Sequence, residues 1–199
     1  RPPVEFKGNE RYRVNGVLGQ GGFGTVYDAV DVATGGRVAV KALRHVGADQ
    51  LLRFKQEFRA LADISHENLV RLDRLEQTGD GAWFAMELVD GVDFLTWTRA
   101  SASHLVPALQ QLVRGISALH QKGILHRDLK PSNILVDTHE RVGRVVIVDF
   151  GVAQLLTDEQ SQRTVEGTPA YMAPEQLTGA ASTASDWYAL GVVLLEVLT

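Results

Sequence analysis

Two short polar runs in the second half of the chain constrain it most. Residues 126–133 read HRDLKPSN and residues 149–151 read DFG, with a short apolar run at 145–148 before the second. Asp128, Asn133 and Asp149 are therefore expected on short loops beside strands. Oxygen-bearing side chains of this kind suit Mg²⁺, which takes few protein ligands and otherwise binds phosphate and water. The pattern predicts a site for magnesium and phosphate.

A glycine-rich stretch near the N-terminus is the second feature. Residues 19–24 read GQGGFG, and the β-rich run 25–32 follows it. A dinucleotide site would need a helix directly after such glycines, and none is expected here. The stretch instead fits a flap between two antiparallel strands that covers phosphates. A simple glycine turn is the alternative.

A lysine in an apolar strand adds to this picture. Residues 37–43 predict a strand, paired to 25–32 through a turn at 33–36, in which Ala39 and Lys41 share one face. A lysine that faces an interior needs an anionic partner. Glu57 is the candidate, beside the apolar face of a helix expected over 50–64. A structural ion pair explains both residues, and so does a phosphate-holding lysine positioned by Glu57; the glycine-rich flap favours the second reading.

Composition limits the remaining classes. The chain has 199 residues, 45% of them hydrophobic and 22% charged, which is enough to bury a core in one domain or two lobes. A formal net charge of −4 argues against nucleic acid as a partner. There are no cysteines, which excludes disulfides and Cys-ligated metals. The longest apolar stretch, 188–195, is too short to span a bilayer.

Taken in order, these motifs resemble the eukaryotic-like (Hanks-type) protein kinases. The matching features are the glycine-rich loop with Val26, the run Val-Ala-Val before Lys41, Glu57, the HRD run with Asn133, the DFG run, and an Ala-Pro-Glu run at 173–175. Together they cover essentially the whole chain. Residues 165–177 look most like bacterial serine/threonine kinases of this type.

The resemblance implies a bilobal α+β fold. A β-rich N-lobe is expected over about 11–89, with further strands at 12–18, 69–75 and 82–88. A helical C-lobe is expected over about 90–199, with a long helix striped by apolar residues from 105 to 119 and a last helix over 184–198.

Roles in catalysis follow from the same resemblance. Lys41 would hold the α- and β-phosphates of ATP and be oriented by Glu57. Asp149 would bind Mg²⁺, and Asn133 a second Mg²⁺.

Asp128 would orient the substrate hydroxyl and accept its proton, and Lys130 would steady the transferred phosphate. Met86 would precede a hinge at 87–89, and Asp93 would touch ribose. The full set expected to contact the nucleotide, besides Lys41, is Leu18, Gly19, Gln20, Gly21, Gly22, Phe23, Gly24, Val26, Ala39, Met86, Glu87, Val89, Asp93 and Leu135.

Substrate class and regulation are also implied. Lys130, two residues after Asp128, and Thr168 in the run Gly-Thr-Pro are typical of serine/threonine rather than tyrosine kinases. Arg127, before Asp128, is typical of kinases switched by activation-loop phosphorylation, and Thr164 stands at the usual phosphosite spacing. One departure is Gln154, where the family often has a basic residue; Arg53 is the candidate substitute.

We therefore expect ATP- and Mg²⁺-dependent transfer of the γ-phosphoryl group to Ser or Thr of a protein. A pseudokinase or scaffold is the alternative, and it would require a lost catalytic residue. A small-molecule phosphotransferase of related fold is disfavoured by Ala173, Pro174 and Glu175. The expected partners are a protein substrate and a transient second copy for trans-phosphorylation, with no nucleic acid and no membrane contact from this segment. The expected location is the cytoplasm, or the cytoplasmic part of a longer, membrane-anchored protein.

The last helix raises one further expectation. Residues 184–198 are apolar around almost the whole circumference, which is typical of a helix buried on all sides. The family surrounds this helix with further helices and pairs the glutamate of the Ala-Pro-Glu run with an arginine, neither of which this sequence encodes. We expect a fragment in which Glu175 lacks that arginine and an apolar patch faces water.

Overall fold

The computed structural model describes residues 6–21, 24–43, 48–78, 81–139, 142–150 and 168–199. They divide into two compact units, which we call the sheet unit and the helical unit. The sheet unit contains the described residues up to Ser65 together with Arg71–Leu88. The helical unit contains His66–Val70 and the described residues from Val89 onward. A β-rich unit and a mainly helical unit confirm the expected α+β class.

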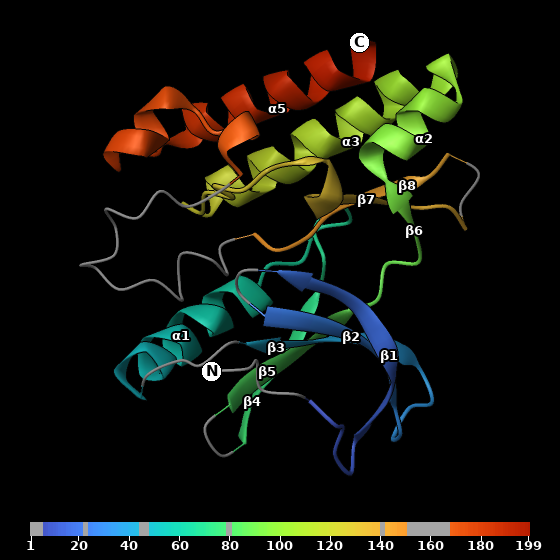
Figure 1. Ribbon diagram of the computed structural model, residues 1–199, viewed down its shortest axis with the longest axis vertical. Coiled ribbons are helices and arrows are strands. Elements are labelled where there is room, and N and C mark those ends of the chain that lie inside the picture. The colour runs from blue at the N-terminus through green and yellow to red at the C-terminus, as the bar shows by residue number, and fades with distance from the viewer. Residues whose placement is uncertain (1–5, 22–23, 44–47, 79–80, 140–141, 151–167) are drawn as a thin grey trace. The chain divides into compact units, whose positions relative to one another are not determined.

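The sheet unit is an antiparallel five-stranded sheet with one helix (Figure 1). Its strand order is β1-β2-β3-β5-β4, and each neighbouring pair is antiparallel. The elements are β1 Tyr12–Gly21, β2 Gly24–Asp31, β3 Arg37–Leu43, α1 Ala48–Ala62, β4 Leu72–Thr78 and β5 Gly81–Glu87.

The two faces of this sheet bury different sets of side chains, because successive residues of a strand point to opposite faces. One face carries a core cluster formed by Phe6, Tyr12, Tyr27, Ala29, Val40, Ala42, Trp83 and Ala85. On the other face, Phe54 and Phe58 of α1 pack against Phe84 of β5, with ring centroids 6.4 and 5.2 Å from that of Phe84. Helix α1 is thus attached through aromatic contacts to the face that carries Lys41, since Phe84 is the register partner of Lys41.

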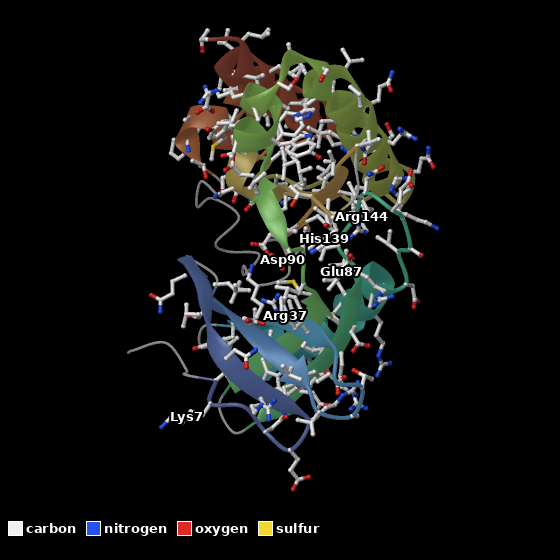
Figure 2. The ribbon with its side chains drawn as sticks, turned by 90° about the vertical axis from the view of Figure 1, so that its right-hand side faces the viewer. Lys7, Arg37, Glu87, Asp90, His139 and Arg144 are labelled. Carbon is white, nitrogen blue, oxygen red and sulfur yellow. The ribbon has the colours of Figure 1, made fainter. Side chains whose placement is uncertain are left out.

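The helical unit combines helices with a small sheet of order β6-β7-β8. Its strands and α-helices are β6 Gly91–Asp93, α2 Phe94–Ala100, α3 Ala102–Gln121, β7 Ile134–Asp137, β8 Arg144–Ile147 and α5 Thr183–Leu198. Three short 3-10 turns complete it: η1 Pro131–Asn133, η3 Pro169–Tyr171 and η4 Pro174–Thr178. Where β7 ends and β8 begins, Asp137 accepts a hydrogen bond from His139 at 2.8 Å and lies 3.7 Å from Arg144, both labelled in Figure 2.

Residues 66–70 belong to the helical unit, although they lie between α1 and β4 in the sequence. The Asn68 side chain donates to the Val145 carbonyl at 2.8 Å and to Gln111 Oε1 at 3.0 Å. Ile147 N–H donates to Asn68 O, and Val70 N–H donates to Ile147 O. The first lobe expected over about 11–89 is therefore interrupted by a segment that is hydrogen-bonded to β8.

Helix α5 is buried on one side only. Ser185, Asp186, Ala189, Leu190 and Val193 are buried, whereas the large apolar side chains of Trp187, Tyr188, Leu195 and Leu198 are exposed. Its apolar circumference is thus only partly covered within this chain. In the described parts of the sequence, no helix combines the length and the apolar character that crossing a bilayer requires.

Candidate active site

The backbone of the HRD run is held by one buried carboxylate of helix α5. Asp186, 1% exposed, accepts from His126 N–H through Oδ2 and from Arg127 N–H through Oδ1, both at 2.9 Å. Its Oδ2 also lies 2.8 Å from His120 Nε2 of α3. Removing this carboxylate would leave buried N–H donors unsatisfied, which is costly. Asp186 therefore fixes the loop from which Asp128 projects.

His126 connects this loop to the strand end before Asp149. Its Nδ1 accepts from Asp128 N–H at 3.3 Å, so the ring proton is assigned to Nε2, which donates to Val148 O at 2.9 Å. Among the described non-glycine residues, only Arg127 and Asp149 have a positive φ, 65° and 63°. Backbone of this kind is strained, costs on the order of 1–3 kcal/mol per residue and clusters at functional sites.

Both oxygens of the Asp128 carboxylate are held. Oδ1 accepts from Thr168 N–H at 2.9 Å and from the Thr168 hydroxyl at 3.1 Å. Oδ2 lies 2.8 Å from Lys130 Nζ and accepts from Asn133 Nδ2 at 3.2 Å. Lys130 Nζ also donates to Thr168 Oγ1 at 2.8 Å. Residues that are 40 positions apart in the sequence thus form one compact polar group around Asp128.

Asn133 and Asp149 carry the oxygen atoms suited to magnesium. Asn133 Nδ2 donates to Asp128 O as well as to its carboxylate, and no hydrogen bond from a described residue reaches Asn133 Oδ1. Val148 N–H donates to Asn133 O at 3.0 Å, which brings the residue before Asp149 to Asn133. The described residues contain no cluster of three or more His, Cys, Asp or Glu that could hold a metal. One amide oxygen and one carboxylate fit Mg²⁺ that takes its other ligands from phosphate and water.

The segment after the HRD run is tied to the Ala-Pro-Glu run. Gln176 Nε2 donates to Arg127 O at 3.0 Å. Glu175 Oε1 accepts from the Ser185 hydroxyl at 2.7 Å, and this hydrogen bond holds the Glu175 pKa below its ordinary value. We expected Glu175 to lack its arginine partner. Within this chain it is instead hydrogen-bonded to the Ser185 hydroxyl. Thr164 and Gln154 lie outside the described residues.

In the sheet unit, several expected nucleotide-contacting residues share one face. Lys41, 4% exposed, is the register partner of Val26 on β2 and of Phe84 on β5. Ala39, two residues earlier on the same face, is the register partner of Met86. Three strands, β2, β3 and β5, therefore bring these side chains to one side of the sheet. Glu57 lies in α1, and its side chain is outside what the structure describes.

The glycine-rich loop joins β1 to β2 as an antiparallel hairpin. Its register pairs Gly21 with Gly24 and Gly19 with Val26, and Leu18 and Gln20 lie in the same strand β1. Gly22 and Phe23 are outside the described residues. Gly24 has a φ of 153°, and a Cβ there would collide with the Ala42 carbonyl oxygen, so only glycine fits.

The remaining expected contacts lie at the end of the sheet unit's last strand and in the helical unit. Glu87, at the end of β5, donates its N–H to Arg71 O at 2.9 Å, and its Oε2 accepts from Arg71 N–H at 3.3 Å. Val89 follows in the helical unit and is partly buried. Leu135 is the register partner of Asp93 in β7 and β6.

Asp93 has a structural task that the sequence reasoning missed. It is the N-cap of α2, with Oδ1 accepting from Thr96 N–H at 3.0 Å and Oδ2 from the Thr96 hydroxyl at 2.6 Å. Burial alone would raise the Asp93 pKa, but these hydrogen bonds lower it below the ordinary value. An Asp three residues before a Thr at a helix start is the signal that could have revealed the cap. No comparable sequence signal links His120 or Gln176 to the HRD run.

Comparison with known proteins agrees with this geometry. The family model for the protein kinase domain matches residues 12–199. The chain is 39% identical over 201 residues to the serine/threonine-protein kinase pkn2 of Myxococcus xanthus, covering 95% of this chain and 24% of that protein. It is 35% identical over 199 residues to PrkC of Bacillus subtilis, covering 95% and 30%. It is 38% identical over 213 residues to PknA of Mycobacterium tuberculosis, covering 100% and 49%.

The chain belongs to the protein kinase domain family and resembles the bacterial serine/threonine kinases within it. The Hanks-type resemblance of its motifs is thereby confirmed. Protein kinases of this family use ATP and Mg²⁺. The chain spans about a quarter to a half of the length of these relatives.

Proposed function

We propose that this chain is the catalytic domain of an ATP- and Mg²⁺-dependent protein serine/threonine kinase. The observation that carries the proposal is the Asp128 carboxylate, fixed by Thr168, Lys130 and Asn133 at the end of a loop that Asp186 anchors. The relatives are named serine/threonine-protein kinases, and Lys41, Asp128, Asn133 and Asp149 are all present. Nothing among these findings supports the pseudokinase alternative.

The roles rest on the resemblance to protein kinases, and the charges of the residues agree with them. Lys41 holds the α- and β-phosphates of ATP and is oriented by Glu57. Val26, Ala39 and Leu135 enclose adenine, and Met86 precedes the hinge at residues 87–89. Asn133 and Asp149 hold Mg²⁺, which when bound neutralises phosphate charge and orients the transferred group.

Asp128 takes the proton from the Ser or Thr hydroxyl. The hydroxyl oxygen then bonds to the γ-phosphorus, and the bond from that phosphorus to the oxygen bridging the β- and γ-phosphates breaks, releasing ADP. Lys130, 2.8 Å from Asp128 Oδ2, provides positive charge for the transferred phosphoryl group. Because its two oxygens are both engaged, Asp128 has a fixed orientation, and geometry matters more here than basicity.

We also propose that Thr164 is phosphorylated and pairs with Arg127. Arg127 Nε is buried and has no hydrogen-bond partner among the described residues. A phosphate carries close to two negative charges and would satisfy this guanidinium. A cytoplasmic location belongs to the same proposal, because the reaction uses ATP. So does a transient dimer, because a second copy of the chain would be the protein substrate in trans-phosphorylation.

Replacing the proposed base tests the function. Asp128→Asn keeps the shape of the side chain and removes its basicity, so turnover falls by roughly 10²–10⁴-fold while nucleotide affinity changes little. Transfer of ³²P from labelled ATP to a protein substrate, with phosphoamino-acid analysis, measures turnover; a fluorescent ATP analogue measures affinity. Asp63→Asn, the same change at an exposed position, is the control. Full turnover in Asp128→Asn, or label on tyrosine, would overturn the proposal.

A further inference from the structure

One hydrogen bond to the HRD run comes from a residue outside the proposed catalytic set. Gln176, in the 3-10 turn η4, donates through Nε2 to the Arg127 carbonyl at 3.0 Å, across 49 positions of sequence. Gln176 is not proposed to contact ATP, Mg²⁺ or the transferred phosphoryl group. Its contact with the loop that carries Asp128 is therefore not explained by nucleotide binding.

The Arg127 carbonyl belongs to the peptide group that leads directly into Asp128. Arg127 has a φ of 65°, which an L residue adopts only where its surroundings hold it. The carbonyl of this peptide group accepts from Gln176 at 3.0 Å, and its N–H, that of Asp128, donates to His126 Nδ1 at 3.3 Å. Gln176 thus makes the shorter of the two hydrogen bonds that orient the group.

Both ends of the Gln176 amide are engaged. Its Oε1 accepts at 3.0 Å from the N–H of Ala173, a fully buried residue, while Nε2 faces the Arg127 carbonyl. One end must accept and the other must donate, which is what a glutamine amide provides. The hydrogen bonds also assign the amide oxygen and nitrogen, because the reverse orientation would set donor against donor and acceptor against acceptor. The amide is therefore fixed on the segment that contains the Ala-Pro-Glu run.

The same segment holds the other side of Asp128. Thr168 N–H donates to Asp128 Oδ1 at 2.9 Å. Residues 168–176 thus hold the carboxylate through Thr168 and the backbone before it through Gln176. Turning the peptide group would swing the carboxylate, because the Asp128 Cα joins the two. A misplacement of about 1 Å in a catalytic group can lower a rate by roughly 10²-fold.

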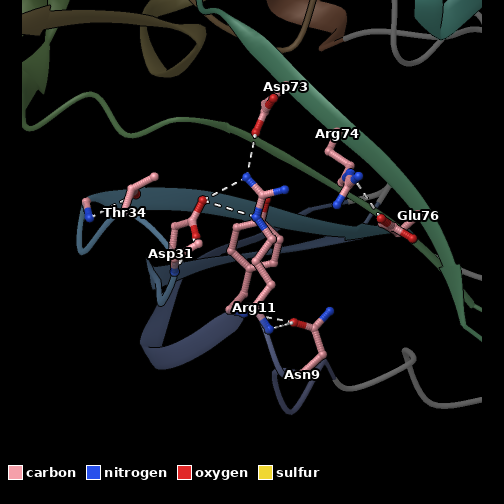
Figure 3. Close-up of polar contacts among 10 residues, drawn as sticks. Asn9, Arg11, Asp31, Thr34, Asp73, Arg74 and Glu76 are labelled. Atoms are coloured by element: carbon pink, nitrogen blue, oxygen red, sulfur yellow. Dashed lines mark hydrogen bonds and ion pairs between the residues drawn. The ribbon is translucent and has the colours of Figure 1, made fainter.

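Side chains hold backbone groups at structural positions elsewhere in the chain. At the start of β1, Asn9 Oδ1 accepts from Arg11 N–H at 2.9 Å (Figure 3). On α3, Gln111 uses its amide as Gln176 does: its Oε1 accepts from a backbone N–H of β8, and its Nε2 donates to Gly143 O, both at 2.9 Å. Gln111 therefore offers the same chemistry at the turn between β7 and β8 instead of the HRD run.

We propose that Gln176 is a positioning residue of the kinase reaction, a role that rests on the proposed function of Asp128. Its amide fixes the peptide group before Asp128, so the orientation of the base depends on the fold of residues 168–178. Gln176 acts through Asp128 and touches neither nucleotide nor metal. Its replacement is therefore expected to change the rate of phosphoryl transfer and not the affinity for nucleotide.

Replacing Gln176 with glutamate separates the two ends of the amide. Gln176→Glu keeps the length and the acceptor for Ala173 N–H but removes the donor to Arg127 O. The kcat for ³²P transfer to casein is expected to fall about tenfold or more, with unchanged affinity for a fluorescent ATP analogue. Gln176→Met, neutral and of similar length, lowers kcat as well, which separates the lost donor from the added charge. Gln111→Glu and Gln111→Met are the matched controls and keep kcat.

A ¹⁵N–¹H spectrum recorded without substrate gives a second readout. Thr168 N–H reports the position of its acceptor, the Asp128 carboxylate. Its signal is expected to move upfield in Gln176→Glu, because the hydrogen bond lengthens, and to stay in place in Gln111→Glu.

Full kcat in either Gln176 variant, an unmoved Thr168 signal, or equal losses of kcat in the Gln176 and Gln111 variants would overturn the role of Gln176. In each case the unsubstituted protein still transfers phosphate, so this failure is distinct from a failure of the proposed function. If the unsubstituted protein transfers none, the proposed function fails, and the Thr168 signal still decides whether Gln176 positions Asp128.

Discussion

At the scale of single residues, the HRD run depends on partners far away in the sequence. Asp186 holds the backbone of His126 and Arg127 from 59–60 residues away, and Thr168 holds Asp128 from 40 residues away. The Thr168 contact restricts the orientation of the Asp128 carboxylate, and the Asp186 contacts restrict the backbone before it. A base that must meet a hydroxyl at hydrogen-bond distance requires this kind of restriction.

Arg127 has hydrogen-bond partners for its backbone but lacks one for part of its side chain among the described residues. Its N–H and its carbonyl are both hydrogen-bonded, whereas its buried Nε has no partner among the described residues. An unsatisfied buried donor carries a cost of about 1–3 kcal/mol, which an incoming anion removes.

The proposed anion is a phosphate on Thr164, and a double-mutant cycle tests it. Thr164→Ala is expected to lower the rate of peptide phosphorylation. In an Arg127→Asn background the same change is expected to have no further effect, because the partner is gone. Asparagine is chosen because it tolerates the positive φ of 65° at this position. Additive losses, or an absence of phosphate on residues 161–168 in active protein by mass spectrometry, would contradict the pairing.

At the scale of elements, local signals predicted most strands and the long helices. β2 and β3 were expected within a residue or two of their bounds, since β-branched runs flank a glycine turn. The three-residue strand β6 is too short for a periodic signal and was missed, together with α2 and β7. The expected strand 69–75 is divided: Leu69 and Val70 contact β8, and β4 begins at Leu72.

The sequence motifs name the residues of the candidate site, whose roles remain proposals, but not the contacts of those residues. The motifs identified Asp128, Lys130, Asn133 and Asp149 because the chemistry restricts those positions to few residue types. The partners of Asp128 and of Glu175 come from tertiary hydrogen bonds, for which sequence spacing carries no signal. Helix α5 illustrates the same limit, because its buried Ser185, the partner of Glu175, lies within an otherwise apolar pattern.

One element contact gives a prediction at alkaline pH. Tyr171 of η3 donates to Glu196 Oε2 of α5 at 2.6 Å, and this hydrogen bond, together with burial, raises the Tyr171 pKa to about 12 from an ordinary value of 10.0. The folded state therefore keeps this proton more tightly than the unfolded state. The resulting stabilisation is complete below about pH 10 and declines as the pH rises through about 12.

Tyr171→Phe removes the titrating group, so its stability should decline less steeply between pH 10 and 12. Urea unfolding measured at several pH values in that interval reports the slope. Tyr188→Phe, at an exposed tyrosine of α5, is the matched control and keeps the slope of the unsubstituted protein. Identical slopes for all three proteins would show that the Tyr171–Glu196 contact does not form in solution.

At the scale of the whole molecule, the two units bury their cores separately. The sheet unit places aromatic side chains on both faces of one sheet. The helical unit packs its core around Phe94, Leu112, Ile116, Ile134 and Ile147, all fully buried. In contrast to these buried cores, one apolar face of α5 is exposed to solvent.

That face predicts self-association of the 199-residue chain. Trp187, Gly191, Leu195 and Leu198 follow one another at helical spacing, and Leu195 and Leu198 are 62% and 72% exposed. Contiguous apolar surface of this kind drives association because covering it removes apolar area from water. Replacing both leucines with lysine places charge on the face, and cations near a helix C-terminus also suit its dipole.

Sedimentation velocity over a range of concentrations measures the effect. The unsubstituted chain is expected to shift to larger species as its concentration rises, and the Leu195→Lys, Leu198→Lys chain to remain monomeric. Val106→Lys with Val142→Lys also replaces two apolar side chains with lysine, at valines that are 62% and 59% exposed and lie in α3 and in the turn before β8, so it should leave association unchanged. A monomeric unsubstituted chain at every concentration, or equal loss of association in both double variants, would show that the α5 face does not drive it.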